Sequence, residues 1–137
     1  MNLIEKQILN EYDSDCFVEA ISYEAMGKML DENYVKERFR MFDLRELYIY
    51  GGTYLAVQLY RVGKRHVDIR GIVDRSGKLI MDEEASVITL DELKNIYSGE
   101  TIVITPLRYF HKIRNELLKF VEDKNIVGIG ELLLGIV

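Results

Sequence analysis

The sequence predicts an α/β fold built on a parallel sheet. From about Asp43 onward, short and nearly continuous apolar runs alternate with segments whose apolar residues recur at helical spacing. Continuous apolar runs are typical of parallel strands buried on both faces, and their alternation with helices indicates a sheet covered on each side. We therefore expect a three-layer αβα sandwich whose five parallel strands lie in the order 3-2-1-4-5.

Five segments have the character of buried strands. Each is short, rich in β-branched or aromatic residues, and bounded by turn or capping residues, as strands commonly are. They are residues 47–50, 67–73, 86–88, 101–105 and 126–129. The second ends at Asp74 and leads into a turn at residues 75–78.

The segments between these strands are predicted helices. Residues 53–62 carry apolar side chains at helical spacing, and Thr89 with Glu92 forms a capping box that opens a helix over residues 89–97. A third helix is expected over residues 106–120. Proline is favoured at the first helical position, so Pro106 would begin this helix and Thr105 would be its N-cap.

The chain divides into a helical N-terminal segment, residues 1–42, and an α/β domain, residues 43–137. Apolar residues recur at helical spacing in the first segment, and breaks are expected near Asp15 and Asp31. These helices need a surface to cover their apolar stripes. We expect them to pack on the α/β domain, or to make the chain a homo-oligomer or bind a partner chain. The apolar run 132–137 should likewise pack on the core or a partner.

Composition narrows the function classes. The chain has 137 residues and a net charge of −5, and it shows no basic face, which argues against nucleic-acid binding. A single cysteine, Cys16, excludes an internal disulfide and suits a reducing compartment. No apolar run reaches membrane-spanning length, and no signal peptide is visible. We expect a cytoplasmic protein without membrane or nucleic-acid partners. No Cys/His cluster has metal-ligand spacing.

The most informative stretch is residues 47–56, a strand followed by a glycine turn and an immediate helix. This geometry builds a phosphate site from backbone N–H groups and a helix N-terminus. The dinucleotide fingerprint requires glycine at the first, third and sixth turn positions, which here hold Gly51, Thr53 and Ala56. Either the turn still binds a phosphate or another anion, or Gly51 and Gly52 only make a tight connection.

Other candidate ligand contacts lie beside this turn. The backbone N–H groups of Thr53 and Tyr54 should point into the crevice at the helix start. Asp74 follows the second strand about twenty residues later, where an acidic residue binds ribose hydroxyls in dinucleotide-binding domains; alternatively, it only begins a turn. Thr105 ends the fourth strand, where it either caps the next helix or contacts a ligand.

These segments resemble a known family. Residues 48–53, 71–74, 87–93 and 102–105 are similar to the small Rossmann-like domains of bacterial surface-polysaccharide enzymes. Such domains occur in sugar acyltransferases and sugar-nucleotide dehydratases, and as appended domains on glycosyltransferases and methyltransferases. The resemblance covers about residues 43–132. It implies a crevice for NAD(P) or a nucleotide-sugar, built from Gly51, Thr53 and Asp74.

Residues suited to catalysis are scarce. Tyr60 and Lys64 match a dehydrogenase spacing but end the first helix, away from the crevice. His66 should lie at the opposite edge of the sheet, and His111 is most simply a surface residue. The acidic run 82–84 is read as a loop. We therefore expect a non-catalytic nucleotide-binding module. The alternatives are the cofactor-binding part of a sugar-nucleotide oxidoreductase or dehydratase, and a structural domain with a vestigial site.

Overall fold

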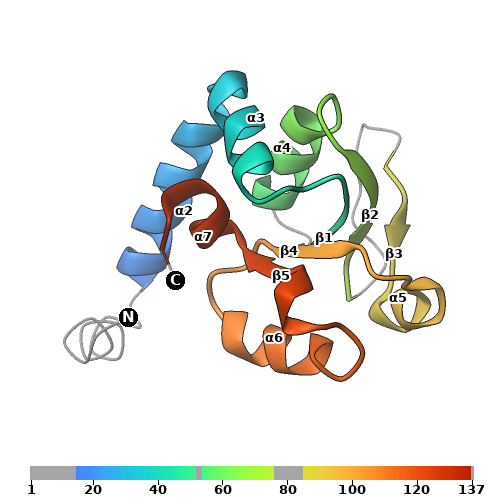
Figure 1. The fold of residues 1–137 in the computed structure, drawn as a ribbon. Coiled ribbons are helices and arrows are strands. Elements are labelled where there is room, and N and C mark those ends of the chain that lie inside the picture. Colours follow the sequence, from blue (N-terminus) through green and yellow to red (C-terminus); the bar gives the residue numbers. More distant parts are fainter. Residues whose placement is uncertain (1–14, 52–53, 76–84, 137) are drawn as a thin grey trace.

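The computed structural model describes residues 15–51, 54–75 and 85–136 of the chain (Figure 1). The strands are β1 (Glu46–Tyr50), β2 (Asp68–Val73), β3 (Val87–Ile88), β4 (Thr101–Ile104) and β5 (Ile126–Gly128). The α-helices are α2 (Asp15–Met29), α3 (Glu32–Met41), α4 (Tyr54–Gly63), α5 (Leu90–Ile96), α6 (Phe110–Leu117) and α7 (Ile129–Leu134). A short 3₁₀ helix, η1 (Asp123–Asn125), precedes β5.

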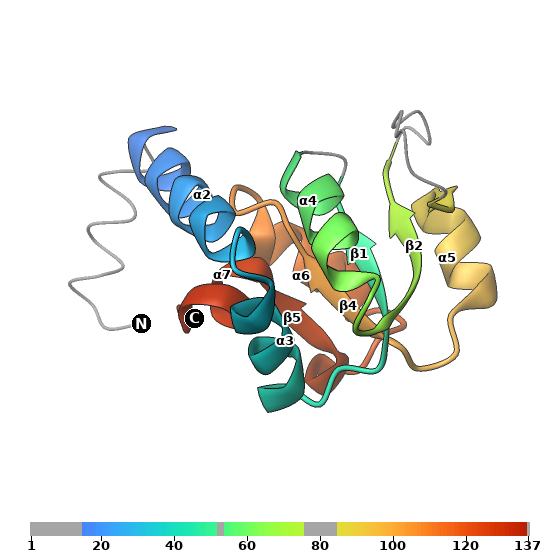
Figure 2. The ribbon, with the colours of Figure 1, turned by 90° about the horizontal axis from the view of Figure 1, so that it is seen from above.

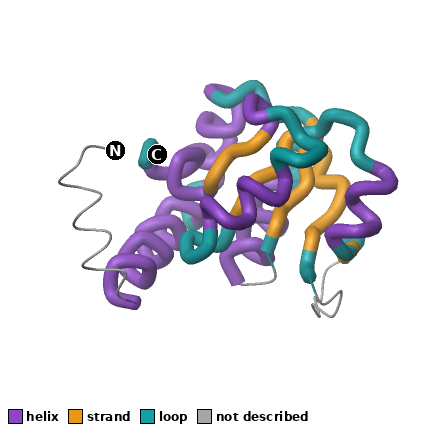
Figure 3. The backbone as a smooth tube through the Cα atoms, turned by 90° about the horizontal axis from the view of Figure 1, so that it is seen from below, coloured by secondary structure: helices purple, strands orange, loops and turns teal. Residues whose placement is uncertain are grey.

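The predicted fold class is confirmed. The described strands form one sheet in the order β3-β2-β1-β4-β5, and every neighbouring pair is parallel. Figure 3 shows the strands in orange, with helices around them. The strand β1 lies at the centre, between β2 and β4. Its register with β2 shifts between Leu47 and Tyr48, whereas its register with β4 is regular.

Two hydrophobic cores lie on the two faces of the sheet, because successive strand residues point to opposite sides. Leu47 and Ile49 belong to the core beneath α2, α3, α4 and α7. Tyr48 and Tyr50 belong to the core beneath α5 and α6. In the part of the chain that the structure describes, the three layers are therefore four helices, the sheet, and two helices.

The N-terminal helices share the first core with the sheet. Ala25, Met29, Val35 and Phe39 are all buried in it, and Figure 2 shows α2 and α3 beside α7. The expected break at Asp31 is confirmed, because Asp31 is the N-cap of α3 and its carboxylate accepts a hydrogen bond from the Tyr34 N–H at 3.2 Å.

The apolar C-terminal run, residues 132–137, was expected to pack either on the core or on a partner. In the structure it packs on this core through its first three residues, 132–134. These residues end α7 (Ile129–Leu134), and Leu132 and Leu133 are fully buried. Arg38 of α3 donates hydrogen bonds to the carbonyl oxygens of Leu132 and Glu131, and the Tyr34 hydroxyl donates to that of Leu133. Carbonyl groups at a helix end lack partners within the helix, so α3 supplies the partners that α7 needs.

The start of the helix after β4 was predicted wrongly. It begins at Phe110 rather than Pro106, and it ends at Leu117 rather than residue 120. Its N-cap is Tyr109, which adopts a left-handed backbone with φ of 67°. Thr105 is therefore not a helix cap. Its hydroxyl has a different partner, described below with the candidate site.

A buried carboxylate lies at the edge of the sheet where the strands begin. Glu100, which precedes β4, is 5% exposed. Its Oε1 accepts hydrogen bonds from the backbone N–H and the hydroxyl of Ser98. Its Oε2 has no hydrogen-bond partner among the described residues, but the Arg70 guanidinium lies 3.9 Å away. Burial raises the pKa of Glu100, and the Ser98 hydrogen bonds and the Arg70 charge lower it more, so the net shift is downward.

Replacing this carboxylate by an amide tests its contribution. A carboxyl whose pKa is lowered by folding stabilises the fold above its unfolded pKa, and this stabilisation is lost as the pH falls through the folded pKa. We expect Glu100→Gln to lower the free energy of unfolding by about 1–3 kcal/mol near neutral pH. The difference from wild type should persist down to the ordinary glutamate pKa of about 4.3 and shrink as the pH falls further, through the lowered folded pKa.

Urea denaturation at several pH values measures this difference. The control is Glu122→Gln, because Glu122 is exposed and pairs with Lys124 at 3.3 Å. That change should alter the free energy of unfolding by less than about 0.5 kcal/mol. A Glu100→Gln curve parallel to that of wild type at every pH would contradict the assignment.

Candidate functional site

The candidate site lies at the edge of the sheet where β1 and β4 end. The helix α4 follows β1 and packs on one face, whereas α6 follows β4 on the other face. The chain therefore leaves these neighbouring strands in opposite directions, which is where open parallel sheets bind ligands. The ends of β1, β2 and β4 bring together Gly51, Asp74 and Thr105.

Gly51 directly follows β1 and adopts a conformation that favours glycine. Its φ is +131°, and a Cβ placed there would lie 2.2 Å from the Thr105 Oγ1 and 2.9 Å from the Pro106 Cδ. Its N–H donates to the Val73 carbonyl oxygen at 2.9 Å. The turn after β1 is thus packed directly against the chain that leaves β4.

Thr105 holds the ends of β1 and β4 together. Both its hydroxyl and its backbone N–H donate to the Tyr50 carbonyl oxygen, each at 2.9 Å. Its side chain is fully buried. The hydroxyl thus serves the packing between strands instead of the first turn of a helix, which explains why the predicted N-cap is wrong.

The structure describes two of the remaining predicted residues, Tyr54 and Asp74, but not the other two. Tyr54 is the first residue of α4 and is exposed, whereas Gly52 and Thr53 lie outside the described residues. Asp74 follows β2, is half-buried, and its N–H donates to the Ile88 carbonyl oxygen at 2.9 Å. Asp74 and Tyr54 therefore both lie at the same edge of the sheet.

The sequence reasoning missed Arg75, which it assigned only to a turn. The Arg75 Nε donates to the Tyr50 hydroxyl at 3.3 Å, and its Nη2 lies 3.0 Å from both carboxylate oxygens of Glu116 on α6. The hydrogen bond to Tyr50 and the pairing with Glu116 raise the pKa of Arg75, which keeps it cationic. Its place directly after Asp74 was the one available signal.

The other candidate groups lie away from this edge. His66 follows α4 at the opposite edge, as predicted, and its Nε2 lies 2.9 Å from the Glu32 carboxylate. His111 is exposed in the first turn of α6. Tyr60 is buried in the first core, with the Lys64 ammonium 5.5 Å from its ring. The acidic run 82–84 lies outside the described residues.

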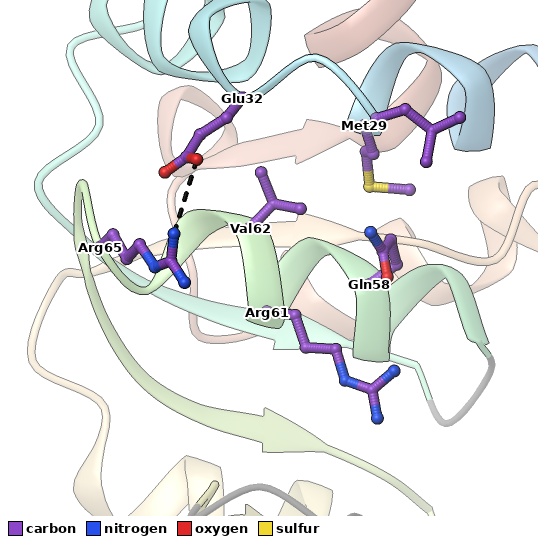
Figure 4. Close-up of a pocket in the computed structure, with 7 residues that line it drawn as sticks. Met29, Glu32, Gln58, Arg61, Val62 and Arg65 are labelled. Atoms are coloured by element: carbon purple, nitrogen blue, oxygen red, sulfur yellow. Dashed lines mark ion pairs between the residues drawn. The ribbon is translucent and has the colours of Figure 1, made fainter.

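A separate pocket of about 260 Å³ lies between the α2–α3 junction and α4 (Figure 4). Glu32 and Arg65 point towards each other at its rim, with 3.6 Å between the charged groups. Glu32 therefore pairs with both Arg65 and His66, which ties α3 to the end of α4. The pocket shares no residue with the end of the sheet that contains Gly51.

Two absences hold for the residues that the structure describes. They contain no cluster of His, Cys, Asp and Glu side chains suited to a metal ion. None of their helices combines the length and apolar character needed to span a membrane.

Comparisons of the chain with family models, curated proteins and solved structures find no match.

The packing at Gly51 leads to a direct test. We expect Gly51→Ala to cost about 2–5 kcal/mol of folding stability, since it combines backbone strain with a collision against Thr105. Gly99→Ala is the matched control, because Gly99 also has a positive φ, +107°, but no heavy atom of the described residues lies within 4 Å of its would-be Cβ. That variant should show the strain alone, about 1–2 kcal/mol. Equal losses in chemical denaturation would show that packing on Thr105 is unimportant.

Proposed function

We propose that this chain is a non-catalytic module that binds an anionic, nucleotide-type ligand at the edge where β1 and β4 end. The ligand class comprises nucleotides, NAD(P) and nucleotide-sugars. The position follows from the topology, since α4 and α6 leave neighbouring strands on opposite faces. The resemblance to surface-polysaccharide enzymes supports a role in the synthesis of surface glycans.

The observation that carries the proposal is the pairing of Arg75. Its Nη2 lies 3.0 Å from both oxygens of the Glu116 carboxylate, and an arginine binds phosphate oxygens through the same kind of charge-assisted hydrogen bond. Glu116 thus occupies the position that a ligand phosphate would take. The side chains of Arg75 and Glu116 are 58% and 31% exposed, so the pair is accessible to an exchanging anion.

Neighbouring groups suit the rest of such a ligand. Asp74 precedes Arg75 and lies at the end of β2, where a carboxylate accepts hydrogen bonds from ribose or sugar hydroxyls. The helix α4 begins at Tyr54, directly beyond the turn at Gly51, and its N-terminus favours negative charge. A cation, a hydroxyl-binding carboxylate and a helix N-terminus therefore share one edge of the sheet.

Titration of the isotope-labelled protein with ADP, NAD⁺, NADP⁺ and UDP-glucose tests the proposal. At least one should cause saturable amide shifts at Gly51, Tyr54, Asp74 and Arg75, with a Kd of about 1 mM or tighter. Arg75→Gln should weaken this binding at least about tenfold, since it removes a charge-assisted contact.

The control for this variant is Arg45→Gln. Arg45 is exposed, pairs with Asp43 at 3.5 Å and precedes β1 at the opposite edge. It should leave binding unchanged. The absence of any saturable shift for all four ligands at millimolar concentration would refute the proposed function.

The partner of Arg75 offers a test in the other direction. Glu116→Gln removes the carboxylate that competes with the ligand, so we expect binding to tighten about three- to tenfold. The exposed pair contributes little to folding, so the free energy of unfolding should change by less than about 1 kcal/mol. Calorimetry and urea denaturation measure the two quantities, with Glu122→Gln as control. Weaker binding by Glu116→Gln would show that the pair maintains the site.

A further inference from the structure

The helix α2 buries one face and presents an unusual opposite face. Ser22, Ala25 and Met29 face the protein interior. Tyr23 is 80% exposed on the outer face. Leu30, directly after the helix, is 81% exposed and also lies at the rim of the pocket that Met29 lines. Tyr23 and Leu30 are seven positions apart, so they lie on the same side of the helix axis, two turns from each other.

Gly27 lies at the middle of this outer face. No heavy atom of the described residues lies within 4 Å of the place where its Cβ would be. A hollow of about 240 Å³ is lined by Tyr23, Glu24, Gly27 and Lys28. Glycine inside an exposed helix is unfavourable for folding, and no packing within the described chain requires it here. A glycine at this position does allow another helix to approach closely.

The charges beside Gly27 are complementary across a two-fold axis. Tyr23 and Leu30 lie on one side of the line through Gly27, and Glu24 and Lys28 lie on the other. The Lys28 ammonium lies 5.0 Å from the ring of Tyr34. In a two-fold interface, when one residue of the first copy contacts a second residue of the other copy, the same contact also forms with the two copies exchanged. Glu24 lies three positions before Gly27 and Lys28 directly follows it, so an antiparallel second copy of the helix would bring each charge close to the opposite charge of its partner.

We propose that two copies of this chain associate through α2, antiparallel, with the two-fold axis near Gly27. Tyr23 then packs against the partner's Leu30, and Glu24 lies beside the partner's Lys28. The helix has 15 residues and is about 22 Å long. A single helix pair of this length makes a small interface, so the dimer forms reversibly at micromolar to millimolar protein concentration.

Sedimentation velocity of the full chain from about 1 µM to about 1 mM tests the association. The wild-type mass should rise from one chain to two. Gly27→Leu fills the crossing point and should weaken the dimer at least about tenfold. It should also keep or raise the Tm of the monomer, because leucine is a better helix former and the space is open. Weaker association together with an unchanged or higher Tm indicates a lost interface, because a folding defect would lower the Tm.

Charge reversal tests the arrangement itself. Glu24→Lys and Lys28→Glu each place like charges across the axis, and each alone should weaken self-association about tenfold. A mixture of the two variants restores both opposite-charge pairs, so mixed dimers should form about as readily as the wild-type dimer. No contact within one chain predicts this restoration.

The outcomes against the proposal are definite. A wild-type mass of one chain throughout the range, as expected if another segment of the same chain covers this face, overturns it. Association that survives Gly27→Leu, or mixing that restores nothing, overturns it too. Ile96→Ala, which alters an exposed apolar residue on α5, should leave association unchanged.

Discussion

The central strand β1 is the constraint on which the rest of the structure depends. It pairs with β2 on one side and β4 on the other, and its last four residues, 47–50, point alternately into the two cores. A shift of one residue would exchange the aliphatic set with the two tyrosines. The two tyrosines also place β1 in contact with charged groups at both ends of the strands. The Tyr50 hydroxyl accepts from Arg75, and the pKa of Tyr48 is raised by burial and by the nearby Glu100 charge.

The charged residues at the two ends of the strands differ in their burial. At the beginning of the strands, Glu100 is buried and held by Ser98 and Arg70, so it serves the fold. At the other edge, the pair of Arg75 and Glu116 is open to solvent. Exchanging a partner is costly for a buried charge but cheap for an exposed one. The exchangeable arginine therefore lies at the edge that topology favours for binding.

The fold could be predicted from the sequence because strands and helix starts are marked by residues that are neighbours in the chain. The apolar runs indicated all five strands, the capping box at Thr89 forms as predicted, and the break expected near Asp31 is where α3 begins. The errors arise where distant contacts decide. Pro106 suits a helix start, but its ring packs against Gly51, 55 residues before it, and the hydroxyl of Thr105 is bonded to Tyr50.

Contacts between residues far apart in the sequence also explain why α7 and the role of Arg75 were not predicted. The helix α7 has only six residues and no side-chain cap, and the partners of its last carbonyls come from Arg38 and Tyr34, more than 90 residues earlier. Arg75 looked like a turn residue because Glu116, 41 residues later, gives no signal near it. A candidate site formed by such pairings is visible only once the strands and helices are placed.

The two proposals concern opposite sides of the sheet. The outer face of α2 belongs to the layer that contains α4 and α7, whereas Glu116 lies on α6 in the other layer. An antiparallel pair of α2 helices would therefore leave Arg75 and Asp74 open to solvent in both copies. Ligand binding should then depend little on protein concentration, since mass action links the two equilibria only when a ligand distinguishes monomer from dimer. The dimer would present two separate sites.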